Sequence, residues 1–489
     1  MAAIITEKFR THNAKQFVEI VSESNSQAYT FIGRPNSWTD DASPPTPADN
    51  YNDEADAHRS MVALKKISSS DVSHAIVRRN WATGTTYDEY RHNYTSSNTA
   101  TSGATTLWDS LYYVVTDDYN VYKCISNNSG GASTQKPDHT TSADSAIPTE
   151  SDGYRWKFMY SISASDVIKF VTNDFIPVKT IGAKQAVGGS SGAQGTAAND
   201  DGSAQYDVEN AAVAGNLLLA RVVSAGSGYT ASTTTTGITI RGDGSSGQAT
   251  VVTNGSGGVS SVSITNAGSG YTTAFIANED IPGFDNGDQA ADGTNNSANI
   301  EFIISPTHGH GADPIEELGG NYVILNSRLE YSEGSGDFPT DNDFRQLGVI
   351  INPATNSSGT QLTATTAKAY KQMTFQASGF SAPSVDTVIR NASTEVVGTA
   401  VGLVVSVDSS NRVISYLPFP NESGNIVAFA NGNTIFSSSS TNHGTLASSS
   451  AITAEEVQRH TGEIIYLENR TSVARASDQI EDIKLIVEM

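Results

Sequence analysis

Two glycine-rich patterns have the spacing of catalytic or nucleotide-binding turns. Residues 188–192 fit G-x-S-x-G, with Ser190 in the position of a serine nucleophile, and residues 242–247 fit the dinucleotide-binding pattern G-x-G-x-x-G. The first pattern requires a hydrophobic strand before it and a helix after it, but its flanks are rich in Gly, Ser and Ala. The second follows a strand-like segment, yet no helix is predicted after it that would bind a pyrophosphate. Neither pattern therefore predicts an active site or a bound cofactor.

Two histidines and three aspartates are candidate metal ligands. His308 and His310 have the H-x-H spacing that places two imidazoles on one side of a strand. The glycines on either side of His310 favour a tight turn instead, and the sequence names no third ligand. Asp285, Asp288 and Asp292 offer oxygen ligands for calcium but miss the EF-hand spacing. We predict no metal site, while the sequence leaves open whether either group binds an ion.

No set of a nucleophile, a base and an orienting group emerges, so we expect no enzymatic activity and no small-molecule substrate. Arg78 and Arg79 beside Trp81 are a candidate nucleic-acid contact, but 29 basic and 52 acidic residues give the chain a net charge of −23. Binding to DNA or to an anionic lipid surface requires a basic face. We therefore expect neither a nucleic acid nor a membrane as a partner, and assign the two arginines to a subunit contact or an internal salt bridge.

Cys124 is the single cysteine of the chain, so we expect neither an internal disulfide nor a multi-cysteine zinc site. The first residues lack the apolar stretch and the cleavage site of a signal peptide. The most apolar stretch, residues 211–223, is interrupted by Asn216 and Arg221 and is too short to span a bilayer. These features predict a soluble protein made in a cytoplasm.

The elements that would position any site are predicted to be mostly strands. Hydrophobic residues make up 37% of the chain and charged residues 17%, and Gly, Ser, Thr, Asn and Ala fill the difference. Turn-forming residues together with many β-branched ones indicate an all-β protein with a few short helices. The principal predicted strands cover residues 111–115, 121–125, 156–162, 394–407, 412–419, 463–467 and 483–489, and the helices cover 13–21, 54–66 and 454–460.

A repeat lies in the glycine-rich middle of the chain. The sequence Ala-Gly-Ser-Gly-Tyr-Thr at residues 225–230 recurs at residues 267–272, a shift of 42 positions. Each copy follows an alternating apolar run, at residues 217–223 and 259–264. A strand, a glycine turn and a tyrosine, repeated, predict a small β-meander or sandwich module rather than a flexible linker. The residues alone thus indicate a β-rich, multi-domain, non-enzymatic assembly or binding protein.

Blocks of sequence outside the repeat carry a more specific signal. The most specific is Arg-His-Thr-Gly-Glu-Ile-Ile-Tyr-Leu-Glu-Asn-Arg at residues 459–470. The other blocks are residues 9–11, 31–38, 75–81, 87–90, 152–160, 172–177, 344–353 and 478–481. Together and in this order they resemble the baseplate wedge subunit of T4-like bacteriophages, the all-β dimeric protein of gene eight.

The resemblance implies a multi-domain β-sandwich core with small β modules inserted into it. The core would comprise residues 1–181, 300–355 and 451–489. The insertions would be the glycine-rich repeat at 182–299 and a second unit, a small barrel or sandwich, at 356–450.

The resemblance also implies a role. The chain would be a structural part of a contractile tail, present in the virion baseplate and assembled in the host cytoplasm. It would form a homodimer and bind the neighbouring wedge subunits, six wedges surrounding a central hub.

Large aromatic and arginine side chains in these blocks have structural interpretations. We expect core positions for Trp38, Trp81 and Trp156. We expect loops to be organised by bidentate pairing of arginines to carboxylates such as Glu463 and Glu468. These arginines are Arg34, Arg78, Arg79, Arg345 and Arg470.

Two other functions stay open at this point. A host-recognition fibre or adhesin would bind surface glycan, with Tyr229 and Tyr271 exposed and stacked on sugar rings, whereas a structural role buries each tyrosine beneath its turn. A hydrolase acting on the cell envelope would need a carboxylate pair or a metal set in a cleft.

Overall fold

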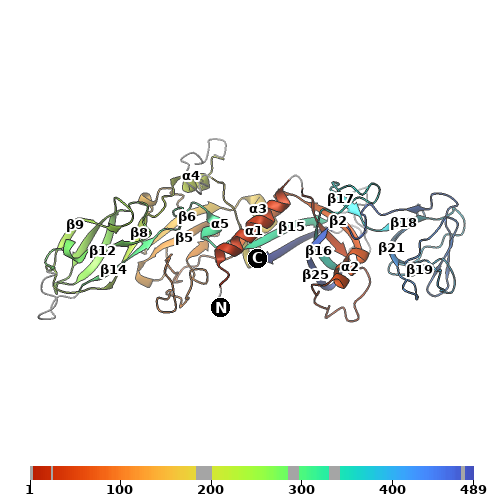
Figure 1. Cartoon of the computed structure of the whole chain (residues 1–489), viewed down its shortest axis with the longest axis horizontal. Coiled ribbons are helices and arrows are strands. Elements are labelled where there is room, and N and C mark those ends of the chain that lie inside the picture. Colours follow the sequence, from red (N-terminus) through yellow and green to blue (C-terminus); the bar gives the residue numbers. More distant parts are fainter. Residues whose placement is uncertain (1–3, 24–25, 183–200, 285–296, 330–341, 475–479) are drawn as a thin grey trace. The chain divides into compact units, whose positions relative to one another are not determined.

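The computed structural model describes residues 4–23, 26–182, 201–284, 297–329, 342–474 and 480–489 (Figure 1). Strands make up 38% of the structure and helices 13%, which confirms the predicted all-β class. The chain divides into two compact units. Unit 1 comprises the described residues within 1–15, 73–324 and 487–489, and unit 2 those within 16–72 and 325–486. Four elements pass from one unit into the other: α1 (Glu7–Ser22), β3 (Val72–Val77), β15 (Tyr322–Leu329) and β26 (Glu481–Glu488).

Unit 2 contains a five-stranded antiparallel sheet of order β17-β2-β1-β16-β25. Its strands are β1 (Ala28–Gly33), β2 (Met61–Ile67), β16 (Asp343–Ile351), β17 (Thr366–Lys368) and β25 (Glu463–Ala474). Every residue of the central strand β1 is buried. Phe31 lies opposite Gly348, where a Cβ atom would come within 2.3 Å of the Phe31 ring, so glycine makes room for the aromatic side chain.

A second sheet of unit 2 has seven strands in the order β23-β22-β19-β20-β21-β18-β24. These are β18 (Lys371–Thr374), β19 (Val388–Arg390), β20 (Val401–Asp408), β21 (Val413–Phe419), β22 (Thr434–Ser437), β23 (Asn442–Thr445) and β24 (Ile452–Thr453). The hairpin of β20 and β21 confirms the strand pair predicted there. Met373, Ile414 and Tyr416 belong to its buried core.

The core of unit 1 is built on a three-stranded sheet of order β4-β5-β6. The strands β4 (Tyr113–Val115), β5 (Asn120–Asn127) and β6 (Tyr154–Ser161) match three predicted strands. Both faces are packed, one with Trp156 and Tyr122 and the other with Tyr112 and Tyr160. β3 pairs with β7 (Phe175–Val178), and short helices α3 (Ala164–Phe170), α4 (Ala204–Ala211) and α5 (Pro314–Glu317) belong to the same unit.

The glycine-rich repeat forms a module of short antiparallel strands within unit 1 (Figure 1). β8 (Leu217–Ser224) pairs with β14 (Asn299–Ile304), and β10 (Arg241–Gly242) pairs with β13 (Ala274–Phe275). β11 (Gln248–Thr253) lies between β9 (Thr234–Thr239) and β12 (Val259–Asn266). The two predicted strands before the repeated turns, β8 and β12, are confirmed.

The two copies of the repeat hold each other through reciprocal backbone hydrogen bonds. Tyr229 N donates to Gly257 O and Tyr271 N donates to Gly215 O, both at 3.1 Å. Gly215 and Gly257 are themselves 42 positions apart, and both have positive φ, 64° and 70°. The two copies are therefore related by an internal pseudo-twofold arrangement. In each copy, the backbone of the tyrosine turn is hydrogen-bonded to the glycine that lies just before the strand of the other copy.

The helix predicted over residues 54–66 is only partly correct. Helix α2 (Tyr51–Ser60) begins at the N-cap Asn50 and ends before Met61, so the second half of the prediction is wrong. Residues 61–67 form β2 instead, because β1 takes β2 as its partner along one edge and the β2 side chains Met61, Val62, Ala63 and Leu64 are all buried. The helix predicted at 13–21 lies within α1.

The helix predicted at residues 454–460 is absent from the described residues there. The backbone of this segment is held by pairing with other segments: Glu456 N donates to Lys368 O at 2.8 Å, and Gln458 N donates to Ala354 O at 2.8 Å. His460 and Gly462 have positive φ, which a helix does not allow. Sheet-like contacts thus replace the local helix hydrogen bonds.

The pseudo-twofold arrangement predicts a sharp difference between two glycines of one turn. In Gly257→Ala the new Cβ would lie 2.6 Å from Tyr229 O at a φ of +70°, whereas at Gly255 the nearest atom is a flexible serine hydroxyl at 3.8 Å. We expect Gly257→Ala to destabilise the module by about 2 kcal/mol or more and Gly255→Ala by less than about 1 kcal/mol. Hydrogen–deuterium exchange over β8 and β12 measures both. Equal exchange in the two variants would contradict the arrangement.

Candidate functional site

The patterns that resembled active sites do not form them. Residues 242–247 make the turn between β10 and β11, and the following element is a strand rather than a helix. The ring of Tyr271 fills this turn, since its hydroxyl donates to Ile240 O at 2.9 Å and accepts a hydrogen bond from Gly247 N at 3.1 Å. Ser190 and its pattern, and Asp285, Asp288 and Asp292, lie outside the described residues.

Both repeat tyrosines are buried, Tyr229 at 4% exposure and Tyr271 at 2%. The adhesin interpretation required both rings to face solvent and stack on sugars. That expectation is wrong, because the Tyr271 ring packs against the turn glycines Gly244 and Gly247, and the Tyr229 ring stacks on Phe284 at 5.2 Å between ring centres.

The paired arginines serve internal contacts of unit 1. Arg78 donates to Asn80 Oδ1 at 2.8 Å and to Thr172 O at 2.9 Å. Arg79 donates to Trp108 O at 3.0 Å, and its guanidinium lies 4.6 Å from the centre of the Tyr113 ring. These are hydrogen bonds to carbonyl groups and an amide, where the sequence suggested a salt bridge.

The remaining tryptophans and arginines fix loops of both units. Trp156 is fully buried as predicted, but Trp38 and Trp81 are half-buried. Arg34 stacks 3.5 Å above the centre of the Trp38 ring, whose Nε1 donates to Arg470 O at 3.0 Å. Trp81 Nε1 donates to Ser133 Oγ at 3.2 Å.

A bidentate arginine pair does form, but to a different carboxylate from those suggested. Arg345 Nε donates to Asp41 Oδ1 at 3.0 Å and Arg345 Nη2 donates to Asp41 Oδ2 at 2.8 Å, rather than to Glu463 or Glu468. Arg470 Nε lies 3.8 Å from Glu468 Oε1, at the long end of an ion pair.

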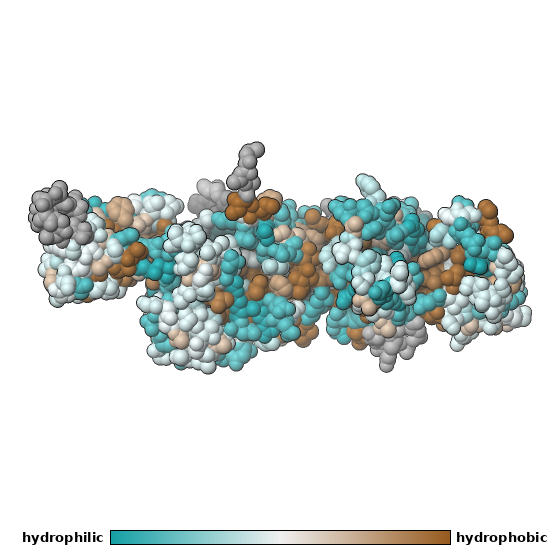
Figure 2. Space-filling view, turned by 90° about the horizontal axis from the view of Figure 1, so that it is seen from below, coloured by the Kyte–Doolittle hydropathy of each residue, from teal (hydrophilic) through white to brown (hydrophobic). Residues whose placement is uncertain are grey.

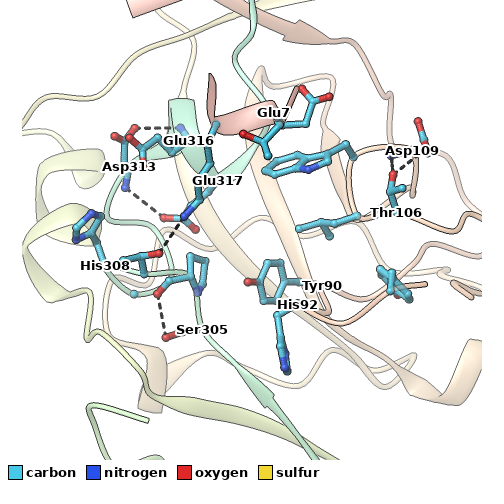
Figure 3. A pocket seen from close by; sticks show the side chains of 18 of the residues that line it. Glu7, Tyr90, His92, Thr106, Asp109, Ser305, His308, Asp313, Glu316 and Glu317 are labelled. Carbon is cyan, nitrogen blue, oxygen red and sulfur yellow. Dashed lines mark hydrogen bonds between the residues drawn. The ribbon is translucent and has the colours of Figure 1, made fainter. Parts of the chain in front are cut away.

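A cavity of about 660 Å³ lies in unit 1 (Figure 3). Its lining comes from the start of α1, from loops between β3 and β4, and from the segment that runs into α5. Figure 3 shows Asp313, Glu316 and Glu317 on one side and Thr106 and Asp109 on the opposite side. The apolar lining includes Ile4, Ile5, Leu107, Trp108 and Pro306.

One residue of a buried ion pair, Glu317, lines this cavity. Glu317 at the end of α5 pairs with Lys123 of β5, and their side chains are 3% and 0% exposed. Glu317 also accepts hydrogen bonds from Gly311 N at 3.0 Å and Asp313 N at 3.2 Å. Burial lowers the pKa of Lys123, and the Glu317 carboxylate opposes that change. The ammonium of Lys123 lies 5.1 Å from the centre of the Tyr90 ring, which lines the cavity.

A second buried pair lies next to the first. Lys157 of β6 is directly opposite Lys123 in the β5–β6 register and pairs with Asp144 Oδ1 at 2.8 Å. His310 packs edge-on against Tyr90 at 5.0 Å between ring centres and is 1% exposed. Burial, and then Lys123, Lys157 and Arg155, hold the pKa of His310 well below its usual range, so this imidazole is neutral. His308 is half-buried and lines the cavity.

The start of α1 is fixed to this site by polar contacts. Lys15 donates to Asp313 Oδ2 at 2.8 Å and to Glu316 Oε1 at 2.9 Å, and Glu7 Oε2 accepts from Asn321 Nδ2 at 3.0 Å. In contrast, three large apolar side chains at the start of α1 face solvent: Ile4 is 84% exposed, Ile5 66% and Phe9 54%. Ile5 and Phe9 also line a shallow hollow of about 330 Å³ beside the cavity.

The acidic side chains on one side of the cavity are held in ion pairs. Three of the cavity's carboxylates, Asp313, Glu316 and Glu317, are each paired with a lysine. Across the described parts of the chain, no three His, Cys, Asp or Glu side chains are grouped as metal ligands. Within the same residues, no helix is long and apolar enough to cross a membrane. The cavity thus has an ion-paired wall, and the exposed aliphatic side chains of Ile4 and Ile5 lie among its lining residues.

Comparison with protein families locates the relationship at the two ends of the chain. The family model described as "Phage-Gp8: Bacteriophage T4, Gp8" matches residues 3–129 and 411–489, somewhat less than half of the chain. No curated protein matches the chain. The blocks at residues 152–160, 172–177 and 344–353 lie outside the matched segments.

The described residues define an all-β protein. Over its two matched ends the chain is similar to the phage Gp8 family, and this similarity supports a structural role in a phage baseplate. The resemblance predicted from the sequence is confirmed over those segments.

The cavity and the two buried lysine–carboxylate pairs next to it were not predicted from the sequence. The one available signal was a lysine in the middle of each apolar strand, at Lys123 and Lys157, because a charged residue at such a position needs a buried partner. Glu317 lies 194 positions from Lys123, and Asp144 precedes Lys157 by 13 positions with loop residues between them, so no regular spacing identifies either partner.

The buried pair predicts unequal effects of neighbouring glutamates. Glu317→Gln removes the partner of a fully buried ammonium and is expected to destabilise unit 1 by about 3 to 5 kcal/mol. Glu316→Gln removes a partly exposed carboxylate, and its partner Lys15 still pairs with Asp313. We expect this variant to lose less than about 1 kcal/mol of unfolding free energy. Chemical denaturation, with hydrogen exchange of β5 and β6 as the local readout, measures the difference. Similar losses in both variants would show that the Lys123 pair does not hold the site.

Proposed function

We propose that the chain is a wedge subunit of a contractile-tail baseplate that forms a homodimer and binds neighbouring wedge subunits. The observation that carries this proposal is the Gp8 family match at both ends of the chain. The protein would act in the virion after assembly in the host cytoplasm. In this role it would be structural rather than catalytic, with no cofactor and no nucleic-acid, membrane or small-molecule partner.

The surface at the start of α1 is the part we assign to a neighbouring subunit. Ile4, Ile5 and Phe9 lie within the matched segment and are exposed beside the cavity. Exposed aliphatic and aromatic side chains that gather at one place mark an interaction site. The contacts of Lys15 and Glu7 hold α1 in place before binding, so little conformational entropy is lost when a partner covers this surface.

The surface composition fits such a subunit. The net charge of −23 keeps a free subunit soluble and disfavours unspecific association. Figure 2 shows one face of the molecule on which hydrophobic groups are separated by hydrophilic and neutral ones. Small separate apolar patches bind only where a partner matches several of them together.

We also propose that the family core carries two insertions, at residues 182–299 and 356–450, with the core in 1–181, 300–355 and 451–489. The unmatched range, residues 130–410, contains the whole first insertion and residues 356–410 of the second. It also contains residues 130–181 and 300–355 of the proposed core, and the family model matches residues 411–450 of the second insertion. The seven-stranded sheet of unit 2 forms its own buried core, as an inserted module does.

Changing one exposed isoleucine tests the docking surface. Ile5→Asp places a charge where a partner's apolar surface would cover it, so we expect at least about tenfold fewer complete baseplates in lysates of cells infected with phage carrying the substitution. Ile168→Asp on α3 is the matched control, because Ile168 is 74% exposed and lies outside the matched segments. Negative-stain electron microscopy counts the baseplates.

Two results would contradict the assignment. One is normal baseplate assembly with Ile5→Asp, and the other is an equal defect with Ile168→Asp. Sedimentation velocity of the purified chain tests dimerisation separately, and a monomer at micromolar concentration would contradict the homodimer.

A further inference from the structure

A second, polar groove of unit 1 has the composition of a ligand site. It measures about 410 Å³, within the range of small-molecule pockets, and is lined by β8, β12, the end of β5 and neighbouring loops. Consecutive residues 219–222 of β8 and 260–262 of β12 form two of its walls. The serines and threonine that contribute hydroxyl groups are Thr101, Ser126, Ser129, Ser260 and Ser261.

Buried charged side chains form part of the groove's lining. Glu89 and Arg91 both line it, with side chains 6% and 7% exposed. Arg91 Nε and Nη2 donate to Glu89 Oε1 at 2.8 and 2.6 Å, which leaves Arg91 Nη1 and Glu89 Oε2 without a hydrogen-bond partner among the described residues. An ionised donor and acceptor side by side in a groove can bind a ligand that both donates and accepts hydrogen bonds.

Both arginines of the groove are paired with glutamates. Arg221 lies on the groove wall with its Nε 3.7 Å from Glu89 Oε1 and its Nη1 3.3 Å from Glu301 Oε2. Glu301 is not itself a lining residue, but its carboxylate offsets the charge of Arg221 as Glu89 offsets that of Arg91, so an anion finds no unpaired guanidinium. A neutral ligand with several hydroxyl groups suits this lining, and Leu219, Val222 and Val262 offer apolar contact for the C–H groups of such a ligand.

We propose that this groove binds a neutral saccharide of one or two sugar rings. The inference is independent of the baseplate role, because it rests on residues of the groove alone. It also differs from the rejected tyrosine-stacking site, since neither Tyr229 nor Tyr271 lines the groove. With no aromatic platform among the lining residues, we expect weak binding, with dissociation constants of about a millimolar.

Two serines of one strand provide a matched test. Ser261 lines the groove and Ser263 does not, although both are exposed and point to the same face of β12. Ser261→Tyr fills the groove, while Ser263→Tyr makes the same change outside it. The full-length chain is titrated with glucose, galactose, N-acetylglucosamine, maltose and lactose, and with inorganic phosphate as an anionic probe, using saturation-transfer difference NMR.

The proposal predicts that at least one saccharide binds the wild-type chain and Ser263→Tyr equally, and binds Ser261→Tyr at least about tenfold more weakly. Three results would overturn it: no saccharide binds the wild-type chain at tens of millimolar, Ser261→Tyr binds as well as the wild type, or phosphate binds in the groove while the saccharides do not. Hydrogen exchange of β12 in both variants confirms that the strand is intact.

Discussion

Two buried lysines that lie directly opposite each other constrain the core of unit 1. Lys123 and Lys157 are cross-strand neighbours on β5 and β6, and both side chains are fully buried. Like charges at opposed positions repel, and an unpaired ammonium in a dry core costs several kcal/mol. Each lysine therefore needs its own carboxylate. Asp144 precedes Lys157 by 13 positions, whereas Glu317 lies 194 positions from Lys123. The pairing of Lys123 with Glu317 brings α5 against the sheet and so forms a wall of the 660 Å³ cavity.

Local patterns in the sequence predicted those parts of the fold that depend on neighbouring residues. The repeat at residues 225–230 and 267–272 identified two strands and two buried tyrosines, because glycine turns and alternating side chains act over a few positions. The helix predicted over residues 54–66 failed at Met61, where helical spacing was overridden by the need of β1 for a partner strand. The helix predicted over residues 454–460 was wrong for a similar reason, because the backbone of this segment is hydrogen-bonded to residues about 90 to 100 positions away.

The candidate site was less predictable than the fold. Its lining comes from the start of α1, the loops around residues 90–109 and the segment 305–317, and no spacing rule connects these. The sequence singled out His308 and His310 for metal binding, whereas the structure packs His310 on Tyr90 and places only His308 in the cavity lining. Family resemblance, in contrast, was visible in short blocks of sequence, and the blocks at the two ends of the chain lie within the segments that the Gp8 family model matches.

The central claim is that this chain is a structural component of a phage baseplate, and its location in the particle tests that most directly. Antibodies raised against the glycine-rich module, residues 217–266, are applied to purified virions for immunogold electron microscopy. The account predicts gold clustered around the plate at the tail end. Gold at the tips of fibres, or virions that immunoblotting shows to lack the protein, would contradict it.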